Sequence, residues 1–133
     1  MDSILTARQE QLFTTYIKIS LQKIPSDKRE KVFKRMIVLE DAKRTFLEDV
    51  SSAIESVHEP FRSVVIKYFG LQGSDQYTLD EISAESSISR YRALYLAKHG
   101  CYKMFDFIFL PTKNTGSFIA KIQEEVDALF SEE

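Results

Sequence analysis

The chain has 133 residues, of which 44% are hydrophobic and 29% charged, a composition typical of one globular domain and not of a disordered chain. Its net charge of −2 argues against a protein that coats nucleic acid indiscriminately. No apolar run approaches the roughly 18 residues of a membrane span, and the N-terminus lacks a signal-peptide pattern. The single cysteine, Cys101, excludes an internal disulfide and fits a reducing cytoplasm, where we expect the protein to be.

Two long helices are predicted in the N-terminal part. Apolar residues recur at three- and four-residue spacing over Thr6–Lys23, and a proline follows soon after. Asp27 and Glu30 then have the spacing of a capping box, which predicts the start of a second helix. We expect this helix to continue to about Val57. The apolar stripe loses its register through Glu40–Thr45, which leaves two helices with a kink as the alternative.

Prolines, a glycine and a serine mark the ends of later helices. Pro60 and Ser117 are expected to begin helices, and Gly70 and Pro111 to end them. Between them, Cys101–Leu110 is apolar on almost every side, which predicts burial on several faces or at an interface. The final helix has an apolar stripe from Phe118 to Phe130.

The segment Thr78–Tyr102 has the pattern of two short helices joined by a tight turn. Thr78 and Glu81 form a capping box, Ser87 lies in the turn, and Ser89 can cap the second helix. That helix carries no acidic residue before Asp106. Its basic residues are Arg90, Arg92, Lys98, His99 and Lys103. This is the pattern of a helix-turn-helix, whose second helix enters the major groove of DNA.

Charge is unevenly distributed along the chain. Lys23–Arg35 and Arg90–Lys103 each carry a local charge of +4. Glu40–Glu59 and Ser117–Glu133 are acidic. Such polarity lets one face meet phosphates while another stays anionic, although solvated helix faces explain Lys23–Arg35 equally well.

Over Ala53–Lys103 several short motifs occur in order and at suitable spacing. They are Pro60, Phe69-Gly70-Leu71, Thr78-Leu79, Glu81-Ile82 and Ile88-Ser89-Arg90. This set resembles region 4 of bacterial sigma factors. The resemblance implies an all-α helix-turn-helix unit that docks on DNA and acts with RNA polymerase.

The chain departs from the sigma-factor pattern at the turn and on the second helix. Ser87 stands where the family usually has glycine, so a left-handed conformation there would cost about 1–2 kcal/mol. Arg92 matches a family arginine, but Leu94 and Tyr95 replace an arginine-glutamine pair that touches DNA. The resemblance therefore does not extend to recognition of the promoter −35 element, and we do not expect a complete sigma factor.

A closer similarity is to small region-4-like regulators of Gram-positive phages, of the ArpU and RinA type, which switch on late genes. They are similar in length and also have helices before the motif. The second motif helix is similar too, with its Ser89-Arg90-Tyr91 start, its Tyr95–Lys98 step and the aromatic end at Met104–Phe107.

Candidate DNA-binding residues lie mainly on the second motif helix. Arg90, Tyr91, Arg92 and Tyr95 are expected to reach base edges, and Lys98 and His99 to contact phosphates. Ser89 and Thr78 are expected to act as caps whose backbone amides lie near phosphates. Additional phosphate contacts are predicted at Lys28, Arg29, Lys31, Lys34 and Arg35. Tyr68, Phe69, Tyr102 and Cys101 are interpreted as core residues because they lie on apolar stripes.

We therefore expect an all-α protein with segments 1–57, 58–110 and 111–133 in one compact unit. The expected function is regulation of transcription through double-stranded DNA, with RNA polymerase as a partner. A palindromic operator would require a homodimer. Cys101–Leu110 and the last helix are the candidate dimer interfaces, and the alternative is that both pack on the N-terminal helices of the same chain. No catalytic, cofactor or metal-binding motif is present, so no enzyme is predicted. Two alternatives remain: a region-4 mimic that binds polymerase or a sigma partner without DNA, and a small terminase-like packaging protein.

Overall fold

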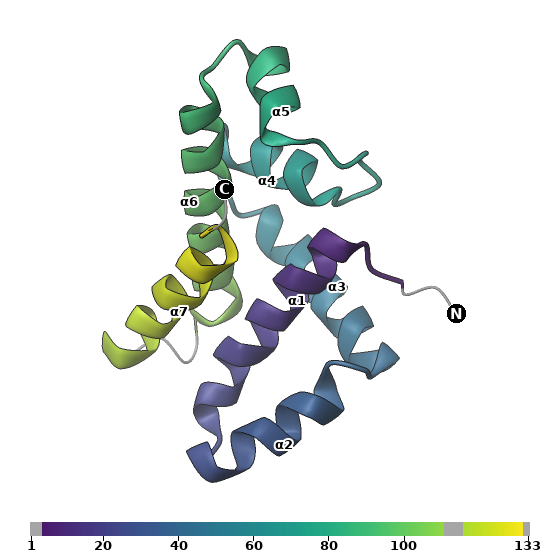
Figure 1. The fold of residues 1–133 in the computed structure, drawn as a ribbon, viewed down its shortest axis with the longest axis vertical. Coiled ribbons are helices and arrows are strands. Elements are labelled where there is room, and N and C mark those ends of the chain that lie inside the picture. Colours follow the sequence, from purple (N-terminus) through teal and green to yellow (C-terminus); the bar gives the residue numbers. More distant parts are fainter. Residues whose placement is uncertain (1–3, 111–115, 132–133) are drawn as a thin grey trace.

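The computed structural model describes residues 4–110 and 116–131. Within these residues the chain forms seven α-helices and one short 3₁₀ helix, with no β-strand. The prediction of an all-α fold is confirmed. In Figure 1 the long helix α6, Arg90–Ile108, occupies the upper left, α5 lies at the upper end and α2 at the lower end.

The first helix follows its predicted span closely. Helix α1, Ala7–Ser20, continues into the 3₁₀ helix η1, Leu21–Lys23, so the last predicted turn is wound more tightly. Thr6 caps α1 through a capping box with Gln9, in which each side chain bonds the other residue's backbone amide.

The prediction of one long second helix is wrong. Helix α2 covers Ser26–Met36 and helix α3 covers Glu40–Ile54, so three α-helices precede Pro60 where two were expected. The charges favour this break: basic residues end α2, and Glu40 and Asp41 begin α3, each stabilised by the adjacent helix dipole. The expected capping box of Asp27 and Glu30 is also wrong, because α2 already begins at Ser26 and has no side-chain cap.

The later helix boundaries agree with prediction, apart from shifts at three ends. Helix α4, Phe61–Phe69, begins one residue after Pro60 and ends at Gly70, whose φ of 64° is the left-handed conformation that glycine favours. Helix α7, Gly116–Leu129, includes the expected cap Ser117 inside the helix. Helix α6 ends at Ile108, and the expected stop Pro111 lies outside the described residues.

Helix α6 forms the centre of the fold and packs against α3, α4, α7 and helix α5, Leu79–Ser86. Its buried side chains are those of Ala93, Leu96, Ala97, Cys101, Met104 and Phe105. They belong to one hydrophobic cluster, to which helices from all three predicted segments contribute.

The start of α1 is joined to the end of α4 by side-chain hydrogen bonds. The Arg8 guanidinium donates to the carbonyl oxygens of Tyr68 at 2.6 Å and Tyr77 at 2.7 Å, and it lies 4.1 Å from the centre of the Tyr68 ring. The Gln9 amide donates to the carbonyl of Phe69 at 2.8 Å. These contacts satisfy carbonyls at a helix end that would otherwise need water.

Candidate nucleic-acid interface

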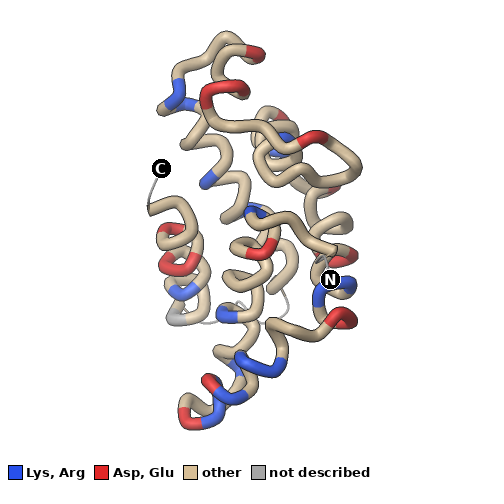
Figure 2. Tube along the Cα trace, turned by 45° about the vertical axis from the view of Figure 1, so that its right-hand side comes forward, with Lys and Arg blue, Asp and Glu red and all other residues tan. Residues whose placement is uncertain are grey.

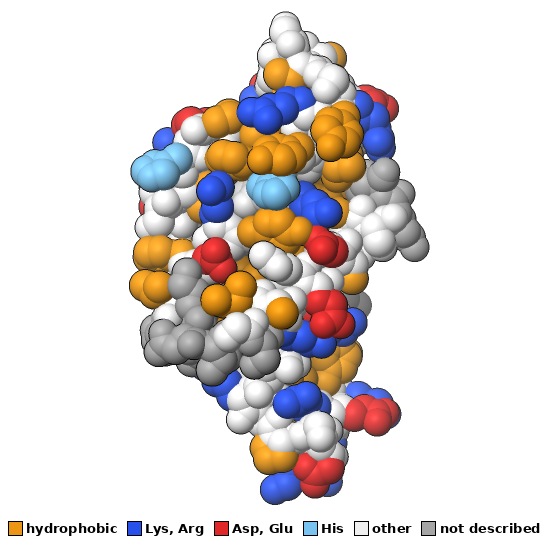
Figure 3. All heavy atoms as spheres, turned by 90° about the vertical axis from the view of Figure 1, so that its left-hand side faces the viewer, with side chains coloured by type: hydrophobic (Ala, Val, Ile, Leu, Met, Phe, Trp, Pro, Cys, Tyr) orange, Lys and Arg blue, Asp and Glu red, His pale blue; other side chains and the backbone are white. Residues whose placement is uncertain are grey.

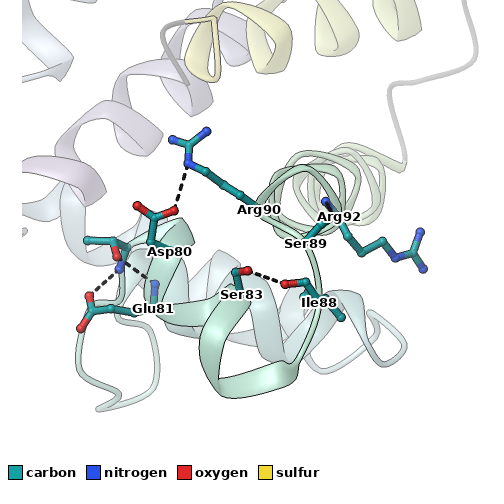
Figure 4. Close-up of polar contacts among 8 residues, drawn as sticks. Asp80, Glu81, Ser83, Ile88, Ser89, Arg90 and Arg92 are labelled. Atoms are coloured by element: carbon teal, nitrogen blue, oxygen red, sulfur yellow. Dashed lines mark hydrogen bonds and ion pairs between the residues drawn. The ribbon is translucent and has the colours of Figure 1, made fainter.

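The α5–α6 corner is built by local hydrogen bonds that the sequence predicts. Thr78 Oγ1 accepts from the Glu81 amide at 3.1 Å, and the Glu81 carboxylate accepts from the Thr78 amide at 2.9 Å (Figure 4). Ser89 Oγ accepts from the Arg92 amide at 2.9 Å and so caps α6. Both residues act as the expected caps, which fixes where each helix of the corner starts.

The turn between α5 and α6 keeps a left-handed residue, although a serine stands at this position. Ser87 has φ 55° and ψ 42°, in the left-handed region. The Ile88 amide bonds back to the Ser83 carbonyl at 3.1 Å, while the Ser83 hydroxyl donates to the Ile88 carbonyl (Figure 4). Ile88 is also half-buried against the core. The turn is therefore stabilised both by hydrogen bonds to Ser83 and by the packing of the Ile88 side chain.

Two arginines at the start of α6 point in different directions. Arg90 reaches back to α5, where its Nε lies 3.3 Å from the Asp80 carboxylate (Figure 4). Arg92 extends from the other side of the helix, with its guanidinium 5.2 Å from the centre of the Tyr95 ring. Of the two arginines, Arg92 therefore lies on the side of the helix that bears Tyr95.

We define the outer face of α6 as Tyr91, Arg92, Tyr95, Lys98, His99 and Tyr102. Tyr91 is 78% exposed and Tyr95 37% exposed. The Tyr95 and His99 rings stack at 4.1 Å, and the His99 and Tyr102 rings meet edge to face at 5.0 Å. Figure 3 shows hydrophobic and basic side chains gathered around a histidine on the side of the molecule where α6 and α7 lie. The structure thus places five of the predicted contact residues on one face of α6, where aromatic rings alternate with basic side chains. These five residues are Tyr91, Arg92, Tyr95, Lys98 and His99.

Lys98 and Tyr102 both contact a carboxylate of α7. Lys98 Nζ lies 3.2 Å from Asp127 Oδ1, and the Tyr102 hydroxyl donates to the same oxygen. Desolvation and the hydrogen bond to Asp127 raise the pKa of Tyr102 above its ordinary value. Tyr102 was expected in the core: its side chain is partly buried and packs against the core, while its hydroxyl lies at the surface.

The imidazole of His99 lies in a partly buried and positively charged environment. Burial lowers its pKa below the ordinary 6.5, and the charges of Lys98 and Lys103 lower it further. The neutral form is therefore favoured, which weakens His99 as a phosphate contact in the free protein.

Besides Tyr102, three residues that border the outer face were not among the predicted contacts. Phe61 of α4 lies 6.4 Å from Tyr95, measured between ring centres, and Lys103 Nζ lies 4.9 Å from the centre of the Phe61 ring. Asp127 comes from α7. Lys103 was visible as one of the basic residues of the helix, whereas nothing local in the sequence connects Phe61 or Asp127 to it.

Leu94 does not belong to the exposed surface. It is half-buried and packs against the hydrophobic core, while Tyr95 beside it is exposed. Of the two residues that differ from the sigma-factor pattern, Leu94 therefore contributes to the core and Tyr95 to the surface. Tyr68, Phe69 and Cys101 are buried as predicted, and burial raises the pKa of the Cys101 thiol far above its ordinary value.

The basic residues of α2 lie at the other end of the molecule. Figures 1 and 2 place α2 at the end opposite to α5, with lysine and arginine positions at both ends. Arg29 has a structural role, since its Nε donates to the carbonyls of Leu21 at 3.1 Å and Ile24 at 2.8 Å. Lys34 pairs with Glu30 at 3.3 Å. Lys28, Lys31 and Arg35 are exposed. The structure does not bring this group together with the outer face of α6.

Among the described residues, no group of three histidine, cysteine, aspartate or glutamate side chains is placed to hold a metal ion. No described helix is both long enough and apolar enough to cross a membrane.

Comparison with known proteins gives no assignment: no family model, no curated protein and no solved structure matches the chain. The class that the fold defines is an all-α protein.

Proposed function

We propose that the chain is a DNA-binding regulator of transcription that docks the start of α6 in the major groove of double-stranded DNA. The observation that carries this proposal is the exposed side of the first two turns of α6. Tyr91, Arg92 and Tyr95 are exposed there, whereas Ala93, Leu96 and Ala97 of the same turns are buried in the core. A helix presented in this way, behind a short helix and a tight turn, has the arrangement of a reading helix.

Within this proposal the two arginines have different roles. Arg92 extends outward and can bond guanine through two parallel hydrogen bonds, the commonest specific contact to DNA. The Tyr95 ring beneath its guanidinium limits the orientations that the side chain can adopt. Arg90 faces Asp80 and acts as a positioning residue between α5 and α6. The role is binding without catalysis, and RNA polymerase is the expected partner by analogy with region 4 of sigma factors.

The proposal is tested on duplexes that the full chain selects from a random library. Arg92→Ala should weaken binding to the selected duplex by about 5- to 150-fold, because one bidentate base contact contributes about 1–3 kcal/mol. Arg92→Lys should keep part of the affinity but lose discrimination at one base pair, since lysine cannot bond bidentately. Arg44→Ala, an exposed arginine of α3, is the matched control and should bind normally. Equal affinities for Arg92→Ala and Arg44→Ala would remove α6 from the DNA interface.

A second candidate function is a protein-binding module that imitates region 4 without touching DNA. The observation that favours it is the exposure of two tyrosines one turn apart, Tyr91 and Tyr95, because aromatic residues are enriched in protein interfaces. A pull-down with RNA polymerase, compared between the native chain and Tyr91→Ser, separates the two candidates. Capture that depends on Tyr91, together with failure to select any duplex, would favour the protein-binding role.

A further inference from the structure

The C-terminal helix places an acidic side chain within the cationic part of the outer face. Lys98 Nζ and the Tyr102 hydroxyl both contact Asp127 Oδ1, from one side of α6. The Lys98 side chain is 35% exposed and that of Asp127 52% exposed, so the contact lies at the surface where a large ligand can reach it. Two donors on successive turns thus meet on one anionic oxygen.

The carboxylate is charged at neutral pH. Although desolvation acts in the opposite direction, hydrogen bonds from Tyr102 and Lys98 leave the pKa of Asp127 below its ordinary value. A carboxylate oxygen and a phosphate oxygen are the same kind of acceptor for an ammonium and a phenolic hydroxyl. The donors that hold Asp127 are therefore suited to hold a DNA phosphate.

Helix α7 does not need this contact in order to stay in place. Its buried residues are Phe118, Ile122 and Val126, and Phe130 directly after the helix is buried as well. Because they anchor the helix in the core, Asp127 would remain close to Lys98 even after its ion pair was broken. A phosphate at Lys98 would then have a negative charge beside it, which opposes binding.

We propose that Asp127 is a built-in competitor for the DNA backbone: it occupies the phosphate position formed by Lys98 and Tyr102 and lowers the affinity of the free protein for duplex DNA. This inference rests on the proposed DNA-binding function. Docking of a duplex exchanges the Asp127 carboxylate for a phosphate oxygen at Lys98. Helix α7 therefore influences the affinity of α6 for the duplex. Removal or neutralisation of Asp127 makes the protein a stronger binder.

The test compares Asp127→Asn with Glu124→Gln in the full chain, on the selected duplex and over a range of salt concentrations. Glu124 lies on the same helix and pairs with Lys121 at 3.7 Å, so its substitution removes the same charge away from Lys98. Asp127→Asn should bind about three- to tenfold more tightly. The slope of log K against log salt should be steeper by about 0.9, since the charge of Lys98 then acts on its phosphate without a carboxylate beside it. Glu124→Gln should stay near the native values. The gain should disappear when Lys98→Met is combined with Asp127→Asn.

An unchanged affinity and salt slope for Asp127→Asn, or an equal gain from Glu124→Gln, overturns the competitor role while the Arg92→Ala result still supports DNA binding. Loss of all dependence on Arg92 overturns the proposed function and this inference with it. Carboxyl NMR of the native chain gives a second measurement that needs no variant: the Asp127 resonance should shift and its pKa should rise when the duplex binds. No change at Asp127 on saturation with DNA contradicts the exchange.

Discussion

Gly100 of α6 lies so close to Val65 of α4 that a Cβ atom added at Gly100 would stand 2.4 Å from Val65 Cγ2 and 3.3 Å from the carbonyl oxygen of Phe61. Glycine inside a helix usually costs about 1 kcal/mol relative to alanine. At this position the close approach of the two helices explains its presence. The same approach brings Phe61 to the edge of the outer face, where its ring neighbours that of Tyr95.

Substitution Gly100→Ala is therefore expected to lower the free energy of unfolding, by about 1–3 kcal/mol, because a methyl group must be forced between packed helices. Chemical denaturation followed by circular dichroism measures the change. Gly116→Ala is the control, since no atom lies within 4 Å of a Cβ added there, and it should be neutral or stabilising. A Gly100→Ala protein as stable as the native one would mean that α4 and α6 separate easily.

Substitution Ser87→Gly should stabilise the protein by about 0.5–1 kcal/mol. The left-handed backbone at Ser87 costs a non-glycine residue about 1–2 kcal/mol, and glycine removes this cost at the expense of greater freedom in the unfolded chain. The control is Ser86→Gly, at the last residue of α5, which should be neutral or destabilising. Thermal unfolding of the two variants side by side gives the comparison, and an equal response would argue against strain in the turn.

Replacement of Arg8 by methionine should destabilise the fold by about 2–3 kcal/mol, because hydrogen bonds from a charged donor to two carbonyls are lost. Lys18→Met, an exposed cation on the same helix, should change stability by less than about 0.5 kcal/mol. The free energies of unfolding of the two variants are compared by urea denaturation. Similar midpoints for the two variants would show that the Arg8 contacts contribute little.

Stability should fall as the pH drops below about 6.5, and His99 should account for part of that fall. The pKa of His99 is lower in the folded protein than its ordinary 6.5, so below this pH the unfolded chain binds the proton first. His99→Gln should flatten the profile between pH 7.5 and 5.5, measured as the slope of unfolding free energy against pH. Carboxyl groups with lowered pKa values act in a more acidic window, because their ordinary values are 4.5 or less. Identical slopes for both proteins would contradict the assignment to His99.

The features that the sequence predicts well are those set by a few neighbouring residues. The capping box at Thr78, the cap at Ser89 and the stop at Gly70 depend on backbone amides and carbonyls within one helical turn. Two separate helices at α2 and α3 were only the alternative to one long helix, because apolar residues continue up to the break. Leu39 was counted in the apolar stripe, yet it is exposed in the fold.

In the candidate site, too, features within one helix could be predicted, whereas contacts between helices could not. Arg92 and Tyr95 were identified from their place on the helix, and their exposure agrees with that choice. The pairing of Lys98 with Asp127 joins positions far apart in the chain, and it depends on how α7 packs against α6. No periodicity within either helix encodes that packing, so the charge state of the outer face could not be predicted.

The hydrogen bonds from Arg8 and Gln9 to the end of α4 have a practical consequence for construction of chimeric proteins. A fragment cut at the predicted boundary, residues 58–110, would lose the donors for these carbonyls and would uncover the core side of α6. The segment 58–110 is therefore not expected to fold as a portable module. A graft onto another scaffold would therefore have to include α1. Exchange of this unit between proteins during evolution would likewise have to include the N-terminal helices.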